Sequence, residues 1–275
     1  MKKLIPLLIT AFVFGWSSVS PAGWEAGGKI GYDSNVDRSI NSGKSDTLFT
    51  GYFSYMKEAA RDRKVDWTFF SMVEGTAYAE YSDLNYIGGT LAPGVTFSLG
   101  PVWSLNLSPF IQGKAVSDSE QTAAAFGAKV NIRQQWTDSL YTGEYYQYTD
   151  SQADEDIYSY TENAFGAFIG YNWTPRFFTE LSYEYARGDS FQSIGTSSTA
   201  TQISGFGNGP RQRYSTVFDE QLIKERVSRH TIGINAGFDF TKSLFSVAGY
   251  SYSTAEGDLG TTDIHFISVG LGYRF

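Results

Sequence analysis

The last nine residues of the chain, ISVGLGYRF (residues 267–275), alternate strictly between large apolar or aromatic side chains and small or polar ones. Because neighbouring side chains of a β-strand point to opposite faces, this alternation predicts a strand with one apolar and one polar face. Residues 24–33 and 231–240 repeat the pattern. Strands of about 9–11 residues with one apolar face are typical of closed barrels that cross a lipid bilayer.

Segments of this kind recur along the whole chain and predict about twelve strands. We place them at residues 24–33, 47–57, 65–80, 86–99, 102–113, 121–134, 139–149, 157–171, 176–187, 226–240, 244–254 and 262–275. The two faces of strand 139–149 are ambiguous, because tyrosine occurs on both, and those of strand 244–254 are ambiguous because serine is mixed into its apolar face.

The connections between these segments alternate in length. The connections expected outside the cell are 34–46, 81–85, 114–120, 150–156, 188–225 and 255–261. The inner turns are 58–64, 100–101, 135–138, 172–175 and 241–243. Every outer connection except 81–85 is at least as long as every inner turn. Long outer loops and short inner turns are typical of outer-membrane barrels. The predicted fold is therefore an all-β, up-and-down antiparallel barrel of about twelve strands, with residues 188–225 as a loop that projects outward or plugs the lumen.

A soluble β-sandwich is the alternative architecture, and two features argue against it. A sandwich would not need an apolar face along nearly every strand. In hydrocarbon, closure into a barrel leaves no sheet edge with unpaired backbone groups.

The N-terminal residues have the pattern of a secretory signal. Lys2 and Lys3 precede an apolar run at residues 4–14 and a small-residue stretch at 17–22. We expect cleavage after Ala22, so that residues 1–22 are a signal peptide and residues 23–275 form the barrel domain. A membrane anchor is the weaker interpretation, because the apolar run is shorter than the roughly 20 residues that a spanning helix needs.

Composition excludes several classes of function. The 275 residues include 29 acidic and 21 basic side chains, and this negative balance argues against nucleic acid as a partner. The absence of cysteine excludes disulfides, thiolate metal sites and cysteine nucleophiles. We expect neither a cofactor nor a bound metal.

Two short motifs resemble known outer-membrane proteins. The terminal Tyr273-Arg274-Phe275 resembles the C-terminal signature that the barrel-assembly machinery reads, which implies a role for Tyr273 and Phe275 in assembly. GYDSNV at residues 31–36 resembles the opening hairpin of a loose group of outer-membrane porins and is similar to the barrel part of surface lipoprotein assembly modifiers. The second family carries a helical-repeat domain before its barrel, and this sequence shows none. The resemblance implies an outer-membrane location and contact with lipid and lipopolysaccharide.

The polar faces of the predicted strands would line the lumen. They carry eight charged residues: Lys29, Glu74, Lys129, Glu144, Glu162, Glu180, Arg229 and Asp239. Our leading hypothesis is a porin-like channel for small polar solutes, weakly selective for cations because acids outnumber bases. Alternatively, paired charges fill the lumen, since about twelve strands lie between a packed barrel and an open one.

Asp33, Asn35 and Asp37 have the one-three-five spacing of a calcium loop. The pattern then fails, because Arg38 stands where glycine is needed and Lys44 stands where a bidentate glutamate is needed. Polar residues that stabilise a turn are the preferred explanation.

Two charged groups fall on predicted outer loops. The acidic group is Asp150, Asp154, Glu155 and Asp156, and the basic group is Arg211, Arg213, Lys224 and Arg226. The acids would bridge to lipopolysaccharide through divalent cations or remain solvated. The bases would bind lipopolysaccharide phosphates or be solvated and balanced by Asp219, Glu220 and Glu225.

His230 and His265 lie near the outer rim, on faces predicted to meet lipid. With Asp263 and Ser251 or Ser253 they suggest an outer-membrane lipid hydrolase as a second hypothesis. The sequence lacks the His-x-Ser spacing of outer-membrane phospholipases. A structural or export-accessory barrel with a protein partner is the third hypothesis, and a homo-oligomer stays open.

Overall fold

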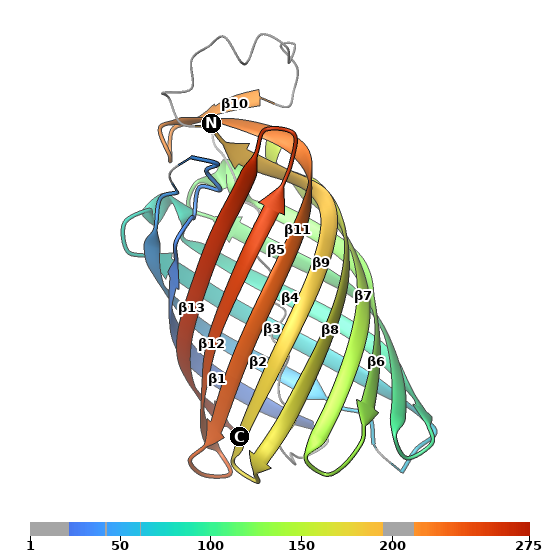
Figure 1. The fold of residues 1–275 in the computed structure, drawn as a ribbon. Helices are drawn as coiled ribbons and strands as arrows, with labels where there is room; N and C mark the ends of the chain where they lie inside the picture. The colour runs from blue at the N-terminus through green and yellow to red at the C-terminus, as the bar shows by residue number, and fades with distance from the viewer. Residues whose placement is uncertain (1–21, 42, 61, 195–211) are drawn as a thin grey trace.

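The computed structural model describes residues 22–41, 43–60, 62–194 and 212–275, and these residues form one antiparallel sheet that closes on itself (Figure 1). Its strands are β1 (Ala22–Asp33), β2 (Asp46–Lys57), β3 (Val65–Tyr78), β4 (Tyr86–Leu99), β5 (Trp103–Val116), β6 (Ala123–Gln135), β7 (Leu140–Ala153), β8 (Tyr160–Thr174), β9 (Phe177–Ser193), β10 (Gln212–Ser215), β11 (Glu220–Asp239), β12 (Leu244–Glu256) and β13 (Thr261–Arg274). Single 3-10 turns occupy the outer loops: η1 (Ser82–Leu84), η2 (Ser119–Gln121) and η3 (Asp156–Tyr158).

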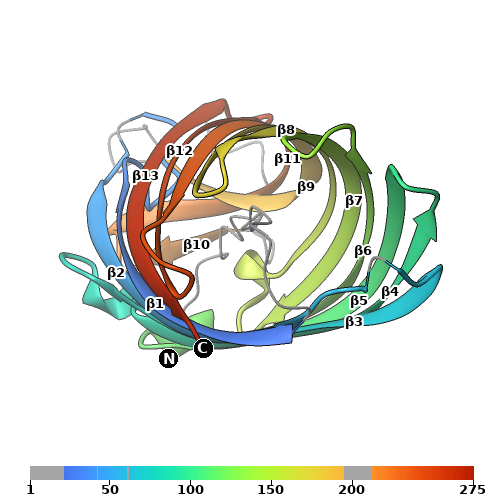
Figure 2. The same ribbon diagram turned by 90° about the horizontal axis from the view of Figure 1, so that it is seen from below.

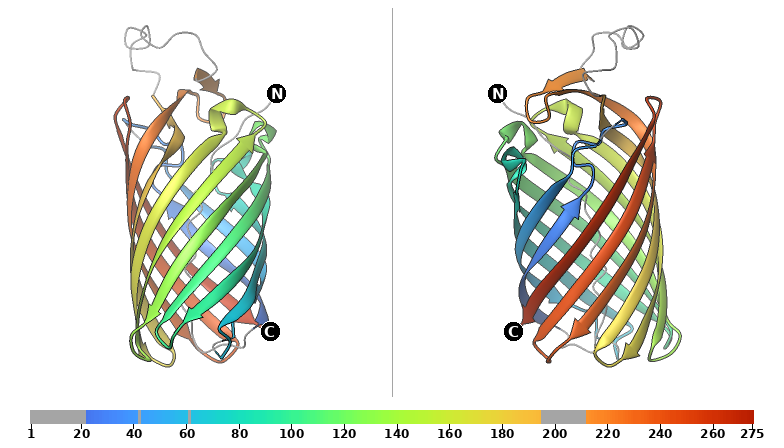
Figure 3. Two further views of the ribbon diagram at one scale, coloured as in Figure 1. Left: turned by 90° about the vertical axis from the view of Figure 1, so that its right-hand side faces the viewer. Right: turned by 60° about the vertical axis from the view of Figure 1, so that its left-hand side comes forward.

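Twelve of these strands make the barrel wall. Each pairs with its neighbours in sequence, β9 pairs with β11, and β13 pairs with β1 to close the ring. The short β10 pairs only with the upper part of β11 and lies beyond the mouth (Figures 1 and 3). The predicted up-and-down barrel of twelve strands is therefore confirmed. The predicted signal peptide lies, apart from Ala22, outside the described residues.

The outer surface of the barrel is apolar. Ile30 on β1 is 55% exposed and Val269 on β13 is 60% exposed, and large apolar side chains are exposed in this way on every wall strand except β7. Leaving apolar area in water costs about 25 cal/mol per Å². A continuous apolar belt around a closed barrel is the surface that lipid covers.

Aromatic side chains mark the membrane boundary at the end with short turns. All five tryptophans of the described residues lie at that end, partly or largely exposed: Trp24, Trp67, Trp103, Trp136 and Trp173. Tryptophan is favoured at membrane–water interfaces, where one edge is apolar and the other wet. The C-terminus lies at this end as well (Figure 1). Among the residues that the structure describes, no helix is long and apolar enough to cross a membrane.

The predicted loop 188–225 is wrong at both ends. Strand β9 continues to Ser193 and β11 begins at Glu220, so that both strands extend beyond the mouth and pair with each other there. Residues 195–211, the middle of that loop, lie outside the described residues.

These extensions carry an apolar cluster over the extracellular mouth, which we name the cap. It consists of Val36, Leu84, Ile157, Tyr158, Phe191, Phe218 and Leu222. The side chains come from three outer loops, the turn between β10 and β11, the end of β9 and the start of β11, and each is at most 3% exposed. In the view from below, the upper β9 and β11 cross the mouth of the barrel (Figure 2). The cap is thus a small hydrophobic core outside the membrane.

Candidate functional site

The barrel lumen holds most of the charged residues expected there. Seven of the eight predicted side chains lie on the inner face: Lys29, Glu74, Lys129, Glu162, Glu180, Arg229 and Asp239. They share this face because the period of two is unbroken along each of their strands.

Glu144 is the exception, and its predicted position in the lumen is wrong. It lies on the outer face of β7 with Tyr146, whose ring packs 4.9 Å from that of the lipid-facing Phe165. Its carboxylate accepts a hydrogen bond of 2.8 Å from Gln134. Tyrosine faces both ways on β7, with Tyr145 inside and Tyr146 outside, so that the pattern did not distinguish the two faces.

Several charged lumen residues were not predicted. With these included, the inner face between the rims carries the acids Glu25, Asp33, Glu74, Glu162, Glu180, Glu184 and Asp239 and the bases Lys29, Lys114, Lys129, Arg133, Arg229, Arg274 and, from the first outer loop, Arg38. Asp189, at the upper end of β9, lines the same cavity as Arg38 and is an eighth acid, so the acids exceed the bases by one. The excess of acids on which the expected cation preference rests is therefore small, and the preference stays a prediction.

Two matching rungs cross the wall from β6 to β9. In the first, the Lys129 ammonium lies 3.9 Å from the ring centre of Tyr145, and the Tyr145 hydroxyl donates a 2.5 Å hydrogen bond to Glu184. The second rung stands four residues away on each strand. There the Arg133 guanidinium lies 4.2 Å from the ring of Tyr141, whose hydroxyl donates to Glu180 at 3.1 Å. Each rung links a cation, an aromatic face and a carboxylate.

Glycine on β8 makes both rungs possible. The tyrosines stand on β7 and their acids on β9, so each ring must cross the strand between them. The Tyr145 ring lies over Gly166 and the Tyr141 ring over Gly170, and a Cβ atom at either glycine would overlap the ring. The sequence spacing Gly-x3-Gly on β8 is therefore matched to Tyr-x3-Tyr on β7.

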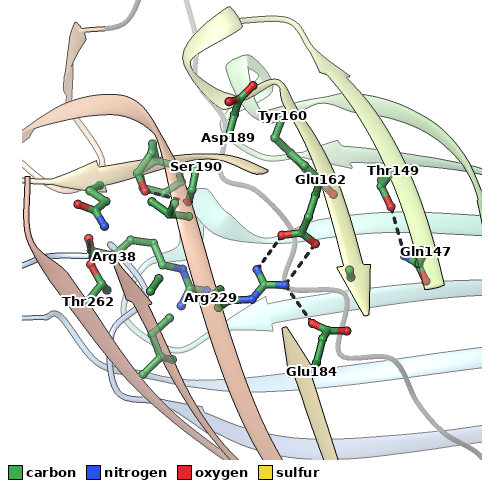
Figure 4. Close-up of a pocket in the computed structure, with 16 residues that line it drawn as sticks. Arg38, Gln147, Thr149, Tyr160, Glu162, Glu184, Asp189, Ser190, Arg229 and Thr262 are labelled. Carbon is green, nitrogen blue, oxygen red and sulfur yellow. Dashed lines mark hydrogen bonds and ion pairs between the residues drawn. The ribbon is translucent and has the colours of Figure 1, made fainter. Parts of the chain in front are cut away.

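Arg229 on β11 joins two of the luminal acids (Figure 4). Its guanidinium lies 3.2 Å from Glu162 and 3.2 Å from Glu184, so that one cation neutralises carboxylates from β8 and β9. Through Glu184 this bridge continues into the rung of Lys129 and Tyr145. The result is a connected network on one side of the extracellular half of the lumen.

A second network lies at the periplasmic end. Arg274 of β13 contacts Asp239 at 2.8 Å and Glu25 at 3.6 Å, and Glu25 accepts a hydrogen bond of 2.9 Å from Tyr52. The Arg274 guanidinium also lies 4.1 Å from the ring centre of Phe245. Arg274 therefore fixes the first and last strands of the barrel together from inside.

The charged outer loops pair with one another. Arg213 forms ion pairs with Glu120 and Glu155, and Lys224 contacts Asp156 at 3.3 Å. Lys44 contacts Glu220 at 2.7 Å. Arg211 lies outside the described residues. The two predicted charge groups thus partly neutralise each other and fasten β10 and β11 to the neighbouring loops, an arrangement that neither interpretation anticipated.

The calcium-like residues stabilise the first outer loop. Asp33 accepts a hydrogen bond from the Asn35 amide at 2.9 Å, the Asn35 side chain bonds to both backbone groups of Ser39, at 2.9 and 3.0 Å, and Asp37 accepts from the Lys44 amide at 2.9 Å. Burial raises the pKa of the Asp37 carboxyl above its usual value. The turn explanation fits these contacts.

The two histidines stand on the outer surface near the extracellular rim. His230 contacts the Tyr183 hydroxyl at 2.8 Å and His265 contacts the Tyr250 hydroxyl at 2.9 Å. Ser253 faces the lumen, where its hydroxyl contacts Thr231 at 2.8 Å, and Ser251 lines a luminal cavity. The barrel wall therefore separates both serines from the histidines, and the predicted Ser-His-acid set is not assembled.

Comparisons with known proteins identify the fold. No family model matches the chain, and no curated protein sequence matches it. Among solved structures, an outer membrane channel from Pseudomonas putida F1 is similar with a TM-score of 0.57 and 11% identity, covering 95% of this chain and 98% of that one. The KdgM porin, solved in complex with disordered oligogalacturonate, has a TM-score of 0.53, 10% identity and coverage of 91% and 99%. The NanC porin has a TM-score of 0.51 and 9% identity, and the match covers 91% of this chain and 100% of that one. The chain shares the fold of outer-membrane porins and channels.

Proposed function

We propose that this chain is a porin-like channel of a bacterial outer membrane that conducts small polar solutes. The observation that carries the proposal is the inner wall, where eight acids and seven bases line a closed barrel with an apolar exterior. Buried charges are unfavourable without partners or water, so this wall is suited to a hydrated passage.

The distribution of these charges favours selection among solutes over a sealed interior. Lys114, Lys129 and Arg133 stand on β5 and β6, whereas Glu162, Glu180 and Glu184 stand on β8 and β9. Bases and acids thus stand on neighbouring strands of one stretch of the wall, where both signs of charge are presented to a polar solute as it passes. The porins and the channel that share this fold support the same proposal by analogy of architecture.

The proposal includes the surroundings of the barrel. We infer that the apolar belt contacts outer-membrane lipid, that the outer rim contacts lipopolysaccharide, and that Tyr273 and Phe275 serve the barrel-assembly machinery. Both terminal aromatic side chains are exposed, Phe275 to 72%, and lie on the outer face of the last strand. An exposed aromatic end is accessible to a protein that receives the unfolded barrel.

Planar-bilayer recording on the purified full-length barrel tests the channel. We expect stepwise conductance in potassium chloride, with little preference between potassium and chloride because the luminal acids exceed the bases by only one. The matched control is a preparation unfolded in urea and added under the same conditions. Folding of the preparation is checked by the change of its electrophoretic mobility on heating. Absence of conductance steps from a preparation that passes this check would contradict the proposal.

Lipid hydrolysis stays the second hypothesis only for a mechanism that does not use the predicted serines. His230 and His265 contact tyrosine hydroxyls, and Ser251 and Ser253 lie on the opposite side of the wall. The expected result is no release of fatty acid from phospholipid vesicles or from lipid A by the purified barrel. Release that disappears in His265→Ala would restore the hypothesis.

A further inference from the structure

A glutamine at the upper end of β9 points into the lumen beneath the cap. Phe191 packs into the cap, where its ring centre lies 5.4 Å from that of Tyr158. Neighbouring side chains of a strand point to opposite faces, so the next residue, Gln192, is directed away from the cap and toward the space below it. Gln192 is only 1% exposed.

Gln192 lines a cavity in the extracellular half of the lumen, which we name the upper cavity (Figure 4). Its wall comes from β7, β8, β9, β11, β12 and β13 and from the first outer loop. The charged side chains of this lining are Glu162, Glu184, Asp189, Arg38 and Arg229. The upper cavity is therefore bounded by the barrel wall at its sides and by the upper β9 and β11 at the mouth.

Both polar atoms of the Gln192 amide lack a hydrogen-bond partner, Nε2 as a donor and Oε1 as an acceptor. Buried polar groups in folded proteins almost always have partners, so a whole amide without any, at the wall of a cavity, points to an occupant of that cavity. The other glutamine of the lining differs, because Gln147 donates to Thr149 at 3.2 Å. Nη1 of Arg38 and Nε of Arg229 are further buried donors of this lining without a hydrogen-bond partner. The occupant has to offer Gln192 an acceptor and a donor at once.

The charges of the upper cavity argue against an anion as the occupant. Both bases of the lining already have acids as partners, since Arg229 bridges two glutamates at 3.2 Å and Arg38 is paired with Asp33 at 3.6 Å. Asp189 adds a third acid to the lining. A carboxylate bound there would meet an excess of like charge, and it would offer Oε1 of Gln192 no donor.

A carboxamide group fits both atoms of Gln192. Its carbonyl oxygen accepts a hydrogen bond from Nε2 while its N–H donates to Oε1, so that two hydrogen bonds form in one plane. A ketone supplies only the acceptor, and an ammonium group supplies only donors. A ligand that reproduces both bonds can displace ordered water from the amide without loss of hydrogen bonding.

We propose that the upper cavity is a binding site for small uncharged solutes that carry a carboxamide edge, the paired N–H and C=O of an amide, urea or lactam, and that Gln192 determines its specificity. The site goes beyond the proposed channel function, because binding at Gln192 does not require that the barrel conducts.

The test is equilibrium binding of four probes to the full-length, detergent-solubilised barrel, followed by saturation transfer from protein to probe in NMR, with empty micelles as background. Nicotinamide carries the carboxamide, and nicotinate, acetylpyridine and picolylamine carry a carboxylate, a ketone and an ammonium group on the same ring. We expect nicotinamide to bind with a Kd on the order of a millimolar, as suits a ligand of its size. The other three should bind about tenfold more weakly, because each leaves an atom of Gln192 unpaired.

Variants locate the binding. Gln192→Met removes the amide at similar side-chain length, and it should weaken nicotinamide binding about tenfold and leave the urea midpoint of unfolding unchanged, since no partner within the protein is lost. Gln192→Glu keeps the shape and removes the donor, and it should weaken binding as well. Gln112→Met is the matched control, because Gln112 lies on β5 outside the upper cavity and donates to Thr90 at 3.4 Å. It should leave nicotinamide binding unchanged.

Three results would overturn the site. The first is another probe that binds as tightly as nicotinamide, which would mean that the carboxamide edge is not what is recognised. The second is no saturable binding of nicotinamide, which would leave water as the occupant. The third is unchanged binding in Gln192→Met, with or without a lower urea midpoint, which would assign the amide to the fold alone. None of these measurements records current, so failure of the site and failure of the channel are separate results.

Discussion

The Tyr145 hydroxyl on β7 donates a 2.5 Å hydrogen bond to Glu184 on β9, across the full width of the strand that separates them. This contact requires the intervening strand to present no side chain at the crossing point, and Gly166 of β8 satisfies that requirement. The same relationship between Tyr141, Gly170 and Glu180 four residues away makes it a repeated device of the wall. Stability and luminal charge are therefore coupled in this region.

Gly166→Ala tests the crossing. A Cβ at this position overlaps the Tyr145 ring, so the ring must move and the bond to Glu184 is lost. We expect the free energy of unfolding to fall by about 1–3 kcal/mol, as for other overpacked sites. Urea titration of the barrel in lipid measures it. Gly51→Ala is the matched control, because a Cβ there meets nothing within 4 Å. Equal losses in the two variants would contradict the account.

Arg229→Gln tests the charge bridge. Without the guanidinium, Glu162 and Glu184 lose their shared cation, and we expect the ratio of potassium to chloride permeability to rise. The unfolding free energy should drop by about 1–3 kcal/mol, the cost of leaving a polar partner unsatisfied. Reversal potentials across a potassium chloride gradient measure the selectivity. Arg229→Lys keeps the charge and should stay near wild type; a shift of the same size in this variant would argue against an electrostatic cause.

Phe218→Ala tests the cap. Phe218 is 1% exposed and packs against Tyr81 at 5.9 Å between ring centres. Truncation should destabilise the cap by about 3–5 kcal/mol and leave the barrel wall intact. We expect faster hydrogen exchange in residues 220–227 and unchanged exchange in β4 to β6. Phe126→Ala, on the lipid-facing side of β6, should leave exchange in 220–227 unchanged; acceleration there in both variants would mean that the cap is not an independent unit.

Asp37→Asn tests the buried carboxyl of the first outer loop. Since burial raises its pKa in the folded protein, the unfolded chain gives up this proton at lower pH than the folded one. Ionisation of Asp37 therefore destabilises the folded loop as pH rises above the usual pKa of an aspartate carboxyl. The loss of stability levels off once pH exceeds the raised pKa of the folded protein. Asparagine keeps the acceptor for the Lys44 amide without the charge.

The measurement is urea unfolding of wild type and Asp37→Asn between pH 4 and pH 8. We expect the variant to gain stability relative to wild type as pH rises. A constant difference across this range would show that Asp37 ionises as freely in the folded protein as in the unfolded chain.

The membrane-spanning part of this fold was predictable because lipid enforces a pattern. Each wall strand must present apolar side chains outward, and that demand repeats every second residue from Trp24 to Phe275. Above the mouth the demand ends. Leu222 and Ile223 are neighbours and both are buried, since the cap covers both faces of β11 there. The alternation of apolar and polar residues does not identify these buried positions. The start of β11 was therefore predicted at residue 226, six residues too late.

The same reason explains which lumen residues were predictable. Arg133 and Glu184 have the parity of Lys129 and Glu180 and could have been identified from it. Lys114 was missed because the strand was ended one residue before it. Arg38 reaches the lumen from a loop, where no period applies, and only the three-dimensional structure could place it.

The central claim is that lipid covers one face of each strand and water reaches the other. The chain has no cysteine, so single cysteines for spin labels can be introduced at residues 268 to 271 of β13 without a background. We predict that labels at Val269 and Leu271 collide mainly with oxygen, as in lipid, and that labels at Ser268 and Gly270 collide mainly with a water-soluble nickel complex. Equal accessibility at all four positions would contradict a membrane-spanning barrel with a hydrated lumen.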